Sequence, residues 1–239
     1  MKTVKMGIFG LGRGSSFYNN ILLNNGEIVA VCDRQEEKLE EAKKILGKDL
    51  AVYRDFDEFL NHPGMEAVFL CTFFHEHAPF AIKALEKNIH VLSECTSNGT
   101  MAEGVALVKE CGRRGILVDV SHASDNTTMD ILRTSTLPVL ATHSDFREVT
   151  FHNRNLTREA ALAIRDSGGV IGFNLCLPFL GGEHIEALLP HLEYALETVG
   201  EDAICFCGDI DGIDAYPAGL SMEYSLHEQM LDFLRGRGY

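Results

Sequence analysis

Short apolar runs, rich in β-branched and aromatic residues, alternate with longer amphipathic segments along the whole chain. The runs predict strands and the segments predict helices. The predicted strands are Val4–Phe9, Ile28–Cys32, Ala51–Tyr53, Ala67–Thr72, His90–Leu92, Ile116–Val120, Val139–Thr142, Val170–Asn174 and Ala203–Phe206. The predicted helices include Gln35–Leu46, Ala78–Lys87, Ala102–Arg113, Arg158–Ser167 and Ile185–Val199. Such strands are too apolar for a sheet with one solvent-exposed face. The pattern therefore indicates an α/β fold with a parallel sheet that helices cover on both faces.

Local signals mark the ends of two predicted helices. Thr100 and Glu103 have the spacing of a capping box, in which each side chain bonds the backbone N–H of the other residue. Thr157 is placed to cap the helix that follows it, and Gly168-Gly169 is a typical stop. These signals support the helix assignments independently of the apolar pattern.

A glycine-rich stretch, GIFGLGRGSS, runs on from the first predicted strand. Gly10 and Gly12 occupy the first two positions of G-x-G-x-x-G, and Ser15 stands at the third. Such a motif gives a tight turn, bare backbone near a pyrophosphate, and a helix N-terminus that holds the anion. Asp33 ends the second strand, where a carboxylate accepts ribose hydroxyls, while the neighbouring Arg34 suits a 2′-phosphate. The pattern predicts a site for NAD or NADP, against the alternative of a glycine-rich turn without a ligand.

Two histidines stand at the ends of successive strands in the second half. His122 follows Ile116–Val120, and His143 follows Val139–Thr142. The carboxyl ends of parallel strands are where such folds present their chemistry, and neutral imidazoles are good zinc ligands. The pair therefore predicts a metal site, against the alternative of two ordinary polar residues at strand ends.

Composition narrows the classes of partner. The 239 residues contain 35 Asp and Glu against 21 Lys and Arg, a net charge of −14, which leaves no evident surface for nucleic acids or anionic membranes. No apolar run reaches the roughly 18–20 residues that span a bilayer, and the first residues lack a signal-peptide pattern. Seven cysteines, mostly within predicted strands and helices, are typical of reduced thiols. We expect a cytoplasmic protein that binds small molecules only.

Residues 1–113 resemble the N-terminal Rossmann domain of the Gfo/Idh/MocA oxidoreductases. The matching stretches are GIFGLGRG, VAVCDR, YRDFDEFL, AVFLCTFFHEHAPFAIKALEKNIHVLSEC and MAEGVALVKECG. The resemblance implies binding of NAD or NADP. Two departures speak against an NAD(P)-dependent oxidoreductase. Glu94-Cys95-Thr96 stands where that family has Glu-Lys-Pro, and its substrate domain does not follow residue 113.

Residues 114–239 resemble the C-terminal half of the membrane (renal) dipeptidase family, zinc-dependent (β/α)8 barrels that hydrolyse dipeptides. The matching stretches are GILVDVSHAS, PVLATHSDFR, HNRNLTREAALAIRDSGGVIGFN and ETVGEDAICFCGDIDG. The resemblance implies that His122 and His143 are zinc ligands, that Arg154 holds the substrate carboxylate, and that Asp209 lies beside the metal-bound water. The same resemblance implies an incomplete zinc site. That family's other half supplies a His-x-Asp and a bridging carboxylate, and no His-x-Asp precedes His122.

The two resemblances meet near residues 113 and 114, which predicts a recombined or engineered chimera of two parts, 1–113 and 114–239. The first part is expected to order its strands 3-2-1-4-5, with the four later strands extending its edge. The predicted fold is α/β, a parallel sheet of eight to nine strands in which a Rossmann-like N-terminal half is fused to a half (β/α)8 barrel. Eight strands would close into a barrel if Ala51–Tyr53 were displaced, and nine would stay open.

Three functions stay open at this stage. Each resemblance covers only part of an active site, so a chimera without catalytic turnover is favoured. It is expected to retain NAD(P) binding through the glycine-rich turn. The alternatives are a residual zinc-dependent dipeptidase-like hydrolase and an NAD(P)-dependent oxidoreductase. The chain also stops where the dipeptidase family would continue, and an unpaired last strand would expose apolar surface that favours a homodimer.

Overall fold

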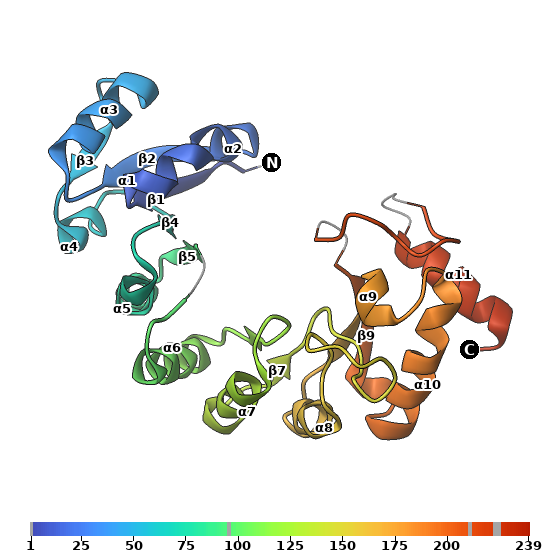
Figure 1. Cartoon of the computed structure of the whole chain (residues 1–239). Coiled ribbons are helices and arrows are strands. Elements are labelled where there is room, and N and C mark those ends of the chain that lie inside the picture. Colours follow the sequence, from blue (N-terminus) through green and yellow to red (C-terminus); the bar gives the residue numbers. More distant parts are fainter. Residues whose placement is uncertain (1, 95–96, 210–211, 222–225) are drawn as a thin grey trace. The chain divides into compact units, whose positions relative to one another are not determined.

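The computed structural model describes residues 2–94, 97–209, 212–221 and 226–239. The chain divides into two compact units, Met1–Glu110 and Cys111–Tyr239, and Figure 1 labels most of their helices and strands. The division falls inside helix α6, Met101–Arg114. Within the described residues, no helix is long and apolar enough to cross a membrane.

The first unit is built on a five-stranded parallel sheet in the order β3-β2-β1-β4-β5. Its strands are β1 (Val4–Phe9), β2 (Gly26–Cys32), β3 (Ala51–Tyr53), β4 (Ala67–Leu70) and β5 (His90–Ser93). The predicted order 3-2-1-4-5 is confirmed. Because β1 lies between β2 and β4, the glycine-rich turn after it lies where the winding direction reverses, and ligands of open α/β sheets bind at such a point.

Helices cover both faces of this sheet, as the apolar strands predicted. They are α1 (Leu11–Gly14), the 3₁₀ turn η1 (Ser15–Phe17), α2 (Tyr18–Leu23), α3 (Glu36–Leu46), α4 (Phe56–Phe59), α5 (Phe74–Glu86) and α6. Successive residues of β1 point to opposite faces: Phe9 packs with Phe59 on one face, and Ile8 packs with Tyr18 and Leu39 on the other.

Four short strands form two parallel two-stranded sheets in the described part of the second unit. They are β6 (Val118–Asp119), β7 (Val139–Leu140), β8 (Ile171–Asn174) and β9 (Ile204–Gly208), and they pair in parallel as β6 with β7 and β8 with β9. The two pairs are joined at Ala141, which bridges Ile171 and whose carbonyl accepts the N–H of Gly172 at 2.7 Å. The four strands therefore follow one another in chain order.

The expectation of one sheet of eight to nine strands is wrong for the described residues, whose main sheet has five strands. Ala51–Tyr53 is not displaced, because it pairs in register with β2. The strands predicted at Ile116–Val120 and Val139–Thr142 are only two residues long in the structure. The reason lies in the hydrogen bonds at their carboxyl ends. There the N–H of Thr142 bonds the carboxylate of Asp119, so side-chain hydrogen bonds replace the backbone ladder.

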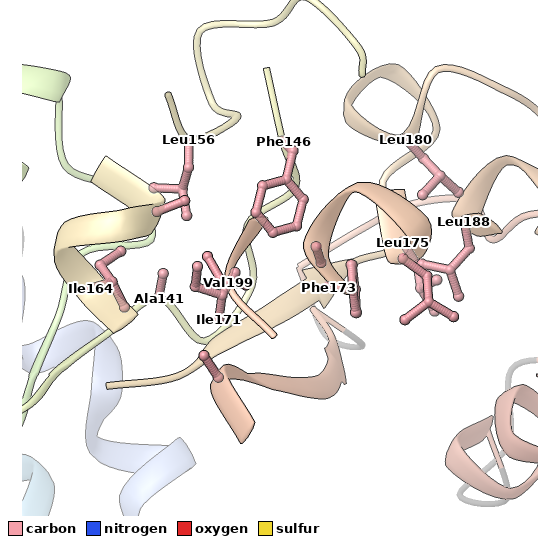
Figure 2. Packing of buried hydrophobic residues seen from close by; sticks show 14 of the residues in the cluster. Ala141, Phe146, Leu156, Ile164, Ile171, Phe173, Leu175, Leu180, Leu188 and Val199 are labelled. Atoms are coloured by element: carbon pink, nitrogen blue, oxygen red, sulfur yellow. The ribbon is translucent and has the colours of Figure 1, made fainter. Parts of the chain in front are cut away.

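Helices and a single apolar core complete the second unit. The helices are α7 (Asp125–Thr134), α8 (Arg158–Asp166), α9 (Leu177–Leu180), the 3₁₀ turn η2 (Ile185–Ala187), α10 (Leu188–Thr198), the 3₁₀ turn η3 (Glu201–Ala203) and α11 (Leu226–Arg237). Thr157 caps α8, as predicted, by accepting the N–H of Ala160 at 3.2 Å. Figure 2 shows Phe146, Ile171 and Phe173 gathered in the core beside the labelled aliphatic side chains.

His191, on α10, is a buried histidine that the fold keeps neutral. Its Nδ1 accepts the N–H of Phe146 at 3.2 Å, and its Nε2 lies 3.2 Å from the carbonyl oxygen of Leu180. Burial lowers its pKa to about 4, against an ordinary value of 6.5. The neutral ring that the folded state prefers needs one accepting and one donating nitrogen, as these two contacts provide.

Acid is therefore expected to weaken the second unit through His191. The stabilising effect of the neutral ring is complete above pH 6.5, where the unfolded state is also neutral, and is lost as the pH falls from 6.5 to about 4. The loss is about 2–3 kcal/mol. Urea unfolding at pH 7, 5 and 4 measures it, with His191→Gln as the matched variant because glutamine keeps one acceptor and one donor. Equal pH dependence in both proteins would contradict this assignment.

Candidate functional site

The two histidines at the strand ends meet in the second unit. β6 and β7 pair in parallel, so their carboxyl ends lie at the same edge of the sheet, and His122 and His143 follow them. The Nε2 atoms of the two rings are 3.0 Å apart, and the ring centroids are 5.0 Å apart. The two histidines that the sequence placed at strand ends are thus brought together as converging imidazoles, while the metal they would hold stays a prediction.

A network behind the histidines holds His143. The hydroxyl of Ser121 donates to Asp119 at 2.6 Å, and the same hydroxyl accepts the backbone N–H of His143 at 3.1 Å. The hydroxyl of Thr142 donates to the other oxygen of Asp119 and lies 2.9 Å from Nδ1 of His143. Backbone and ring of His143 are both tied to β6.

Asp209 follows β9 and is oriented by Asn174 at the end of β8. The side-chain N–H of Asn174 donates to the Asp209 carboxylate at 3.2 Å and to the carbonyl oxygen of His143 at 3.3 Å. Asp209 has a positive φ of 56°, and a Cβ at Gly212 would lie 2.2 Å from its carboxylate oxygen, so a side chain at 212 would displace the carboxylate. One asparagine therefore links the carboxylate to the strand that carries His143.

Arg154 lies on a loop that an arginine clamp holds in place. The Arg147 guanidinium makes two hydrogen bonds to Asp125 at the start of α7, at 2.7 and 2.8 Å, and further bonds to the carbonyl oxygens of residues 152, 153 and 155. The guanidinium of Arg154 lies over the ring of Phe179, 5.4 Å from its centroid. The loop is thus anchored, while Arg154 itself forms no ion pair with the residues that the structure describes.

Charges within the site act on one another. Burial, the positive charge of Arg154 and the neighbouring His143 lower the pKa of His122, while the negative charges of Asp209 and Asp119 act in the opposite direction. The three other residues that the sequence predicted for this site, His143, Arg154 and Asp209, are therefore all within electrostatic reach of His122. A lowered pKa keeps His122 neutral at pH 7, the form that can ligate a metal.

Asp145 is a carboxyl group that sequence reasoning missed. One of its oxygens accepts the N–H of Asn174 at 3.1 Å, the other has no hydrogen-bond partner among the described residues, and the residue is fully buried. Burial raises its pKa to about 8, although Asn174 and the charge of Arg154 act against the rise. The signal for it was present, because His143-Ser144-Asp145 has the His-x-Asp spacing, but the burial of Asp145 was not evident.

The histidine pair fits two ligand positions of a zinc ion. Zinc–nitrogen bonds are about 2.0–2.1 Å long, so two imidazoles on one ion hold their nitrogens about 3.3 Å apart at a tetrahedral angle. The observed 3.0 Å is close to that value. A hydrolytic zinc centre uses three protein ligands, however, and within the described ranges no group of three His, Cys, Asp or Glu converges.

A second site lies in the first unit, at the end of β1. A cavity of about 290 Å³ is bordered by Gly10, Gly12, Asp33 and Arg34 from the sequence prediction, and also by Thr72 and Phe73 after β4. Gly10 has a φ of 91°, and a Cβ there would lie 2.6 Å from the Cys71 carbonyl, so only glycine fits. A Cβ at Gly12 would meet only the flexible end of Lys38.

Asp33 and Ser15 are engaged differently from the expectation. The two Asp33 oxygens accept the N–H groups of Leu11 at 2.7 Å and Gln35 at 2.9 Å, which ties the glycine turn to β2. Ser15 does not border the cavity, and its hydroxyl donates to the carbonyl oxygen of Gly12 at 3.4 Å. That hydroxyl competes with the backbone, and the expected helix is broken into short pieces here. Arg34 pairs with Glu76 at 2.6 Å.

Comparison with known protein families shows which family the chain belongs to. A family model described as membrane dipeptidase (Peptidase family M19) matches residues 39–239. The chain belongs to this family. The match begins well before residue 114, so the border expected from the sequence is not confirmed.

Three proteins similar to this chain differ in how much of it they match. Dipeptidase 3 of Mus musculus is 26% identical over 197 residues, covering 81% of this chain and 38% of the mouse protein. A metallo peptidase from Rhodobacter sphaeroides, solved with a phosphinate mimic of the dipeptide L-Ala-D-Ala, has the same fold, with a TM-score of 0.59 at 22% identity over 88% of this chain and 63% of that one. The apo scyllo-inositol dehydrogenase of Lactobacillus casei is 28% identical over 48% of this chain and 34% of that one, with a TM-score of 0.45.

The dipeptidase resemblance seen in the sequence is thus confirmed at the level of the family. The chain spans 55% of the length of one curated relative and 38% of another. It therefore carries part of what these relatives contain, and the activity of a whole dipeptidase does not transfer to it by descent alone.

Proposed function

We propose that the second unit is a dipeptidase-type binding site that takes one divalent metal ion, zinc by its chemistry, and a small ligand with a carboxylate. His122 and His143 would hold the ion, and Arg154 would hold the carboxylate. When bound, the ion would polarise a carbonyl oxygen of the ligand. The observation that carries the proposal is the 3.0 Å approach of the two Nε2 atoms from neighbouring strand ends.

The surrounding residues support binding more than turnover. Arg154 stacks on Phe179 and is held by a clamped loop, which leaves its planar, five-donor guanidinium ready for a carboxylate. Asp209 lies beside the pair as a proton acceptor. Two histidines supply fewer ligands than a catalytic zinc centre needs, so we infer a chain that binds dipeptides and hydrolyses them slowly or not at all.

A calorimetric titration of the zinc-loaded full chain with L-Ala-D-Ala tests this function. We expect saturable binding that weakens about tenfold to a hundredfold in Arg154→Met, since a charge-assisted bidentate pair contributes roughly 1.5–3 kcal/mol. Arg133→Met is the matched control, because Arg133 is exposed and pairs only with Asp130 three residues earlier on α7. Equal affinity in Arg154→Met and wild type would contradict the assigned role.

We propose NAD(P) binding by the first unit as a second function. The cavity at the end of β1 supports it, because bare glycine backbone, Asp33 and Arg34 border the same space. Fluorescence titration of the full chain with NADH tests it. Gly12→Ala should weaken binding with little effect on the fold, because the added Cβ meets only the end of the Lys38 side chain, whereas Gly236→Ala on α11 should bind normally. The absence of binding up to about millimolar NADH would contradict the proposal.

We also propose that the chain combines two ancestral parts, by recombination or by engineering, near residues 113 and 114. The division into compact units between Glu110 and Cys111 supports this proposal. If the two units fold independently, destabilising one of them should leave the stability of the other unchanged. Hydrogen exchange of a variant destabilised in the second unit should therefore show undiminished protection of β1–β5, and protection lost equally in both units would count against a two-part chain.

A further inference from the structure

Asp119 is the fixed acceptor behind the histidine pair. Four donors converge on its carboxylate: the N–H and hydroxyl of Ser121, at 2.9 and 2.6 Å, and the N–H of Thr142 at 3.2 Å together with its hydroxyl. Burial alone would raise the pKa of Asp119, but the hydrogen bonds together lower it below its usual value. An ionised carboxylate only accepts hydrogen bonds, so every one of these partners must donate.

The single hydroxyl proton of Thr142 is thereby assigned. It goes to Asp119, because a bond to an ionised acceptor is stronger than one to a neutral ring nitrogen. The same oxygen lies 2.9 Å from Nδ1 of His143 and, having no second proton, can only accept there. Nδ1 of His143 must then carry a proton.

The proton on Nδ1 determines whether Nε2 of His143 carries a lone pair or a proton. A neutral imidazole with its proton on Nδ1 has a lone pair on Nε2, and Nε2 of His143 is the atom that faces His122 at 3.0 Å. We propose that Asp119 and Thr142 form a relay that fixes His143 in the Nδ1–H tautomer and so presents its Nε2 lone pair to a divalent cation. The inference rests on the proposed metal site but is visible in the metal-free chain.

Both relay residues are positioning residues, because neither touches the site where an ion would bind. Partners of this kind fix the tautomer and orientation of metal-binding histidines, and their loss costs about 10–100-fold in metal affinity. Ser121 adds a second tie, since its hydroxyl accepts the backbone N–H of His143 while donating to Asp119. Hydrogen bonds through Thr142 and Ser121 therefore connect both the ring and the backbone of His143 to the Asp119 carboxylate.

Long-range ¹H–¹⁵N NMR of the metal-free full chain, labelled at histidine, reads the tautomer directly. In the wild type we expect the Nδ1–H pattern for His143. Thr142→Val keeps the side-chain shape but removes the relay oxygen, and it should shift His143 toward the Nε2–H form. Thr142→Ser should restore the wild-type pattern. Thr134→Val, which removes a hydroxyl that bonds only the Asp130 carbonyl on α7, is the control and should change nothing.

Zinc affinity of the same proteins gives a second readout, with an expected loss of about 10–100-fold in Thr142→Val and recovery in Thr142→Ser. Asp119→Asn replaces Thr142→Val if the latter fails to fold. Its amide can donate to Thr142 and so reverse the relay. A wild-type His143 with its proton on Nε2, or a tautomer that Thr142→Val leaves unchanged, would overturn the proposal whether or not zinc binds. If only the proposed zinc site were wrong, the wild-type chain would have the expected His143 tautomer but would bind no zinc.

Discussion

Replacing Asp145 by asparagine is expected to remove a pH-dependent loss of stability in the second unit, on the order of 4 kcal/mol between pH 4 and pH 7. Burial raises the pKa of Asp145 to about 8. The folded state therefore keeps this carboxyl protonated while the unfolded state ionises it near pH 4. The stability of the native protein is complete below pH 4 and declines as the pH rises toward 8. Asparagine keeps the oxygen that accepts the Asn174 N–H and has no charge to lose.

Urea unfolding between pH 4 and 8 measures the effect. The wild type should lose stability as the pH rises through this window, and Asp145→Asn should lose much less, so that the two curves diverge with increasing pH. Asp202→Asn is the control for net charge, because Asp202 lies exposed in η3, and a change below about 0.5 kcal/mol is expected. Parallel curves for wild type and Asp145→Asn would contradict the buried, neutral carboxyl.

Gly172→Ala is expected to destabilise the second unit by about 4 kcal/mol, above the usual range for overpacking. A Cβ at Gly172 would lie 2.0 Å from the Thr142 carbonyl oxygen. Neither partner can yield easily, because the Gly172 N–H donates to Ala141 and its carbonyl accepts from Ser144, both at 2.7 Å. Pushing β8 away from residues 141–144 would also displace His143 from His122, so zinc binding should fail together with stability.

Chemical denaturation at pH 7 tests this expectation against a matched variant. Gly236→Ala makes the same change in α11, where nothing lies within 4 Å of the added carbon, and it should be neutral or stabilising by about 0.5–1 kcal/mol. A transition midpoint for Gly172→Ala at or above that of the wild type would refute the close approach of β8 to residues 141–144.

The parts of the fold that the sequence predicted are those set by apolar periodicity. β1 and β3 were placed to the residue and the strand order of the first unit was correct, because buried parallel strands are continuous apolar runs between helices. His122 and His143 were paired correctly for a related reason, since neighbouring parallel strands end at the same edge.

Side-chain chemistry accounts for what the sequence did not predict. Asp119 lies inside an apolar run, where the pattern treats it as an interruption, yet its hydrogen bonds end the β6–β7 ladder and orient His143. Asp33 stays a predicted ribose contact because it borders the cavity, but the sequence did not show that its carboxylate also bonds two backbone N–H groups. The burial of Asp145 depends on the loop after β7, whose path no local periodicity records.

Zinc titration of the metal-stripped full chain tests the central claim, that His122 and His143 form one metal-binding pair. Competition with a zinc-sensitive dye at pH 7.5 reports both affinity and stoichiometry. The account predicts one zinc ion per chain, with binding abolished in His122→Ala and equally in His143→Ala, and retained in His227→Ala on α11. Binding that survives in either of the first two variants, or a wild-type chain that takes up no zinc, would contradict it.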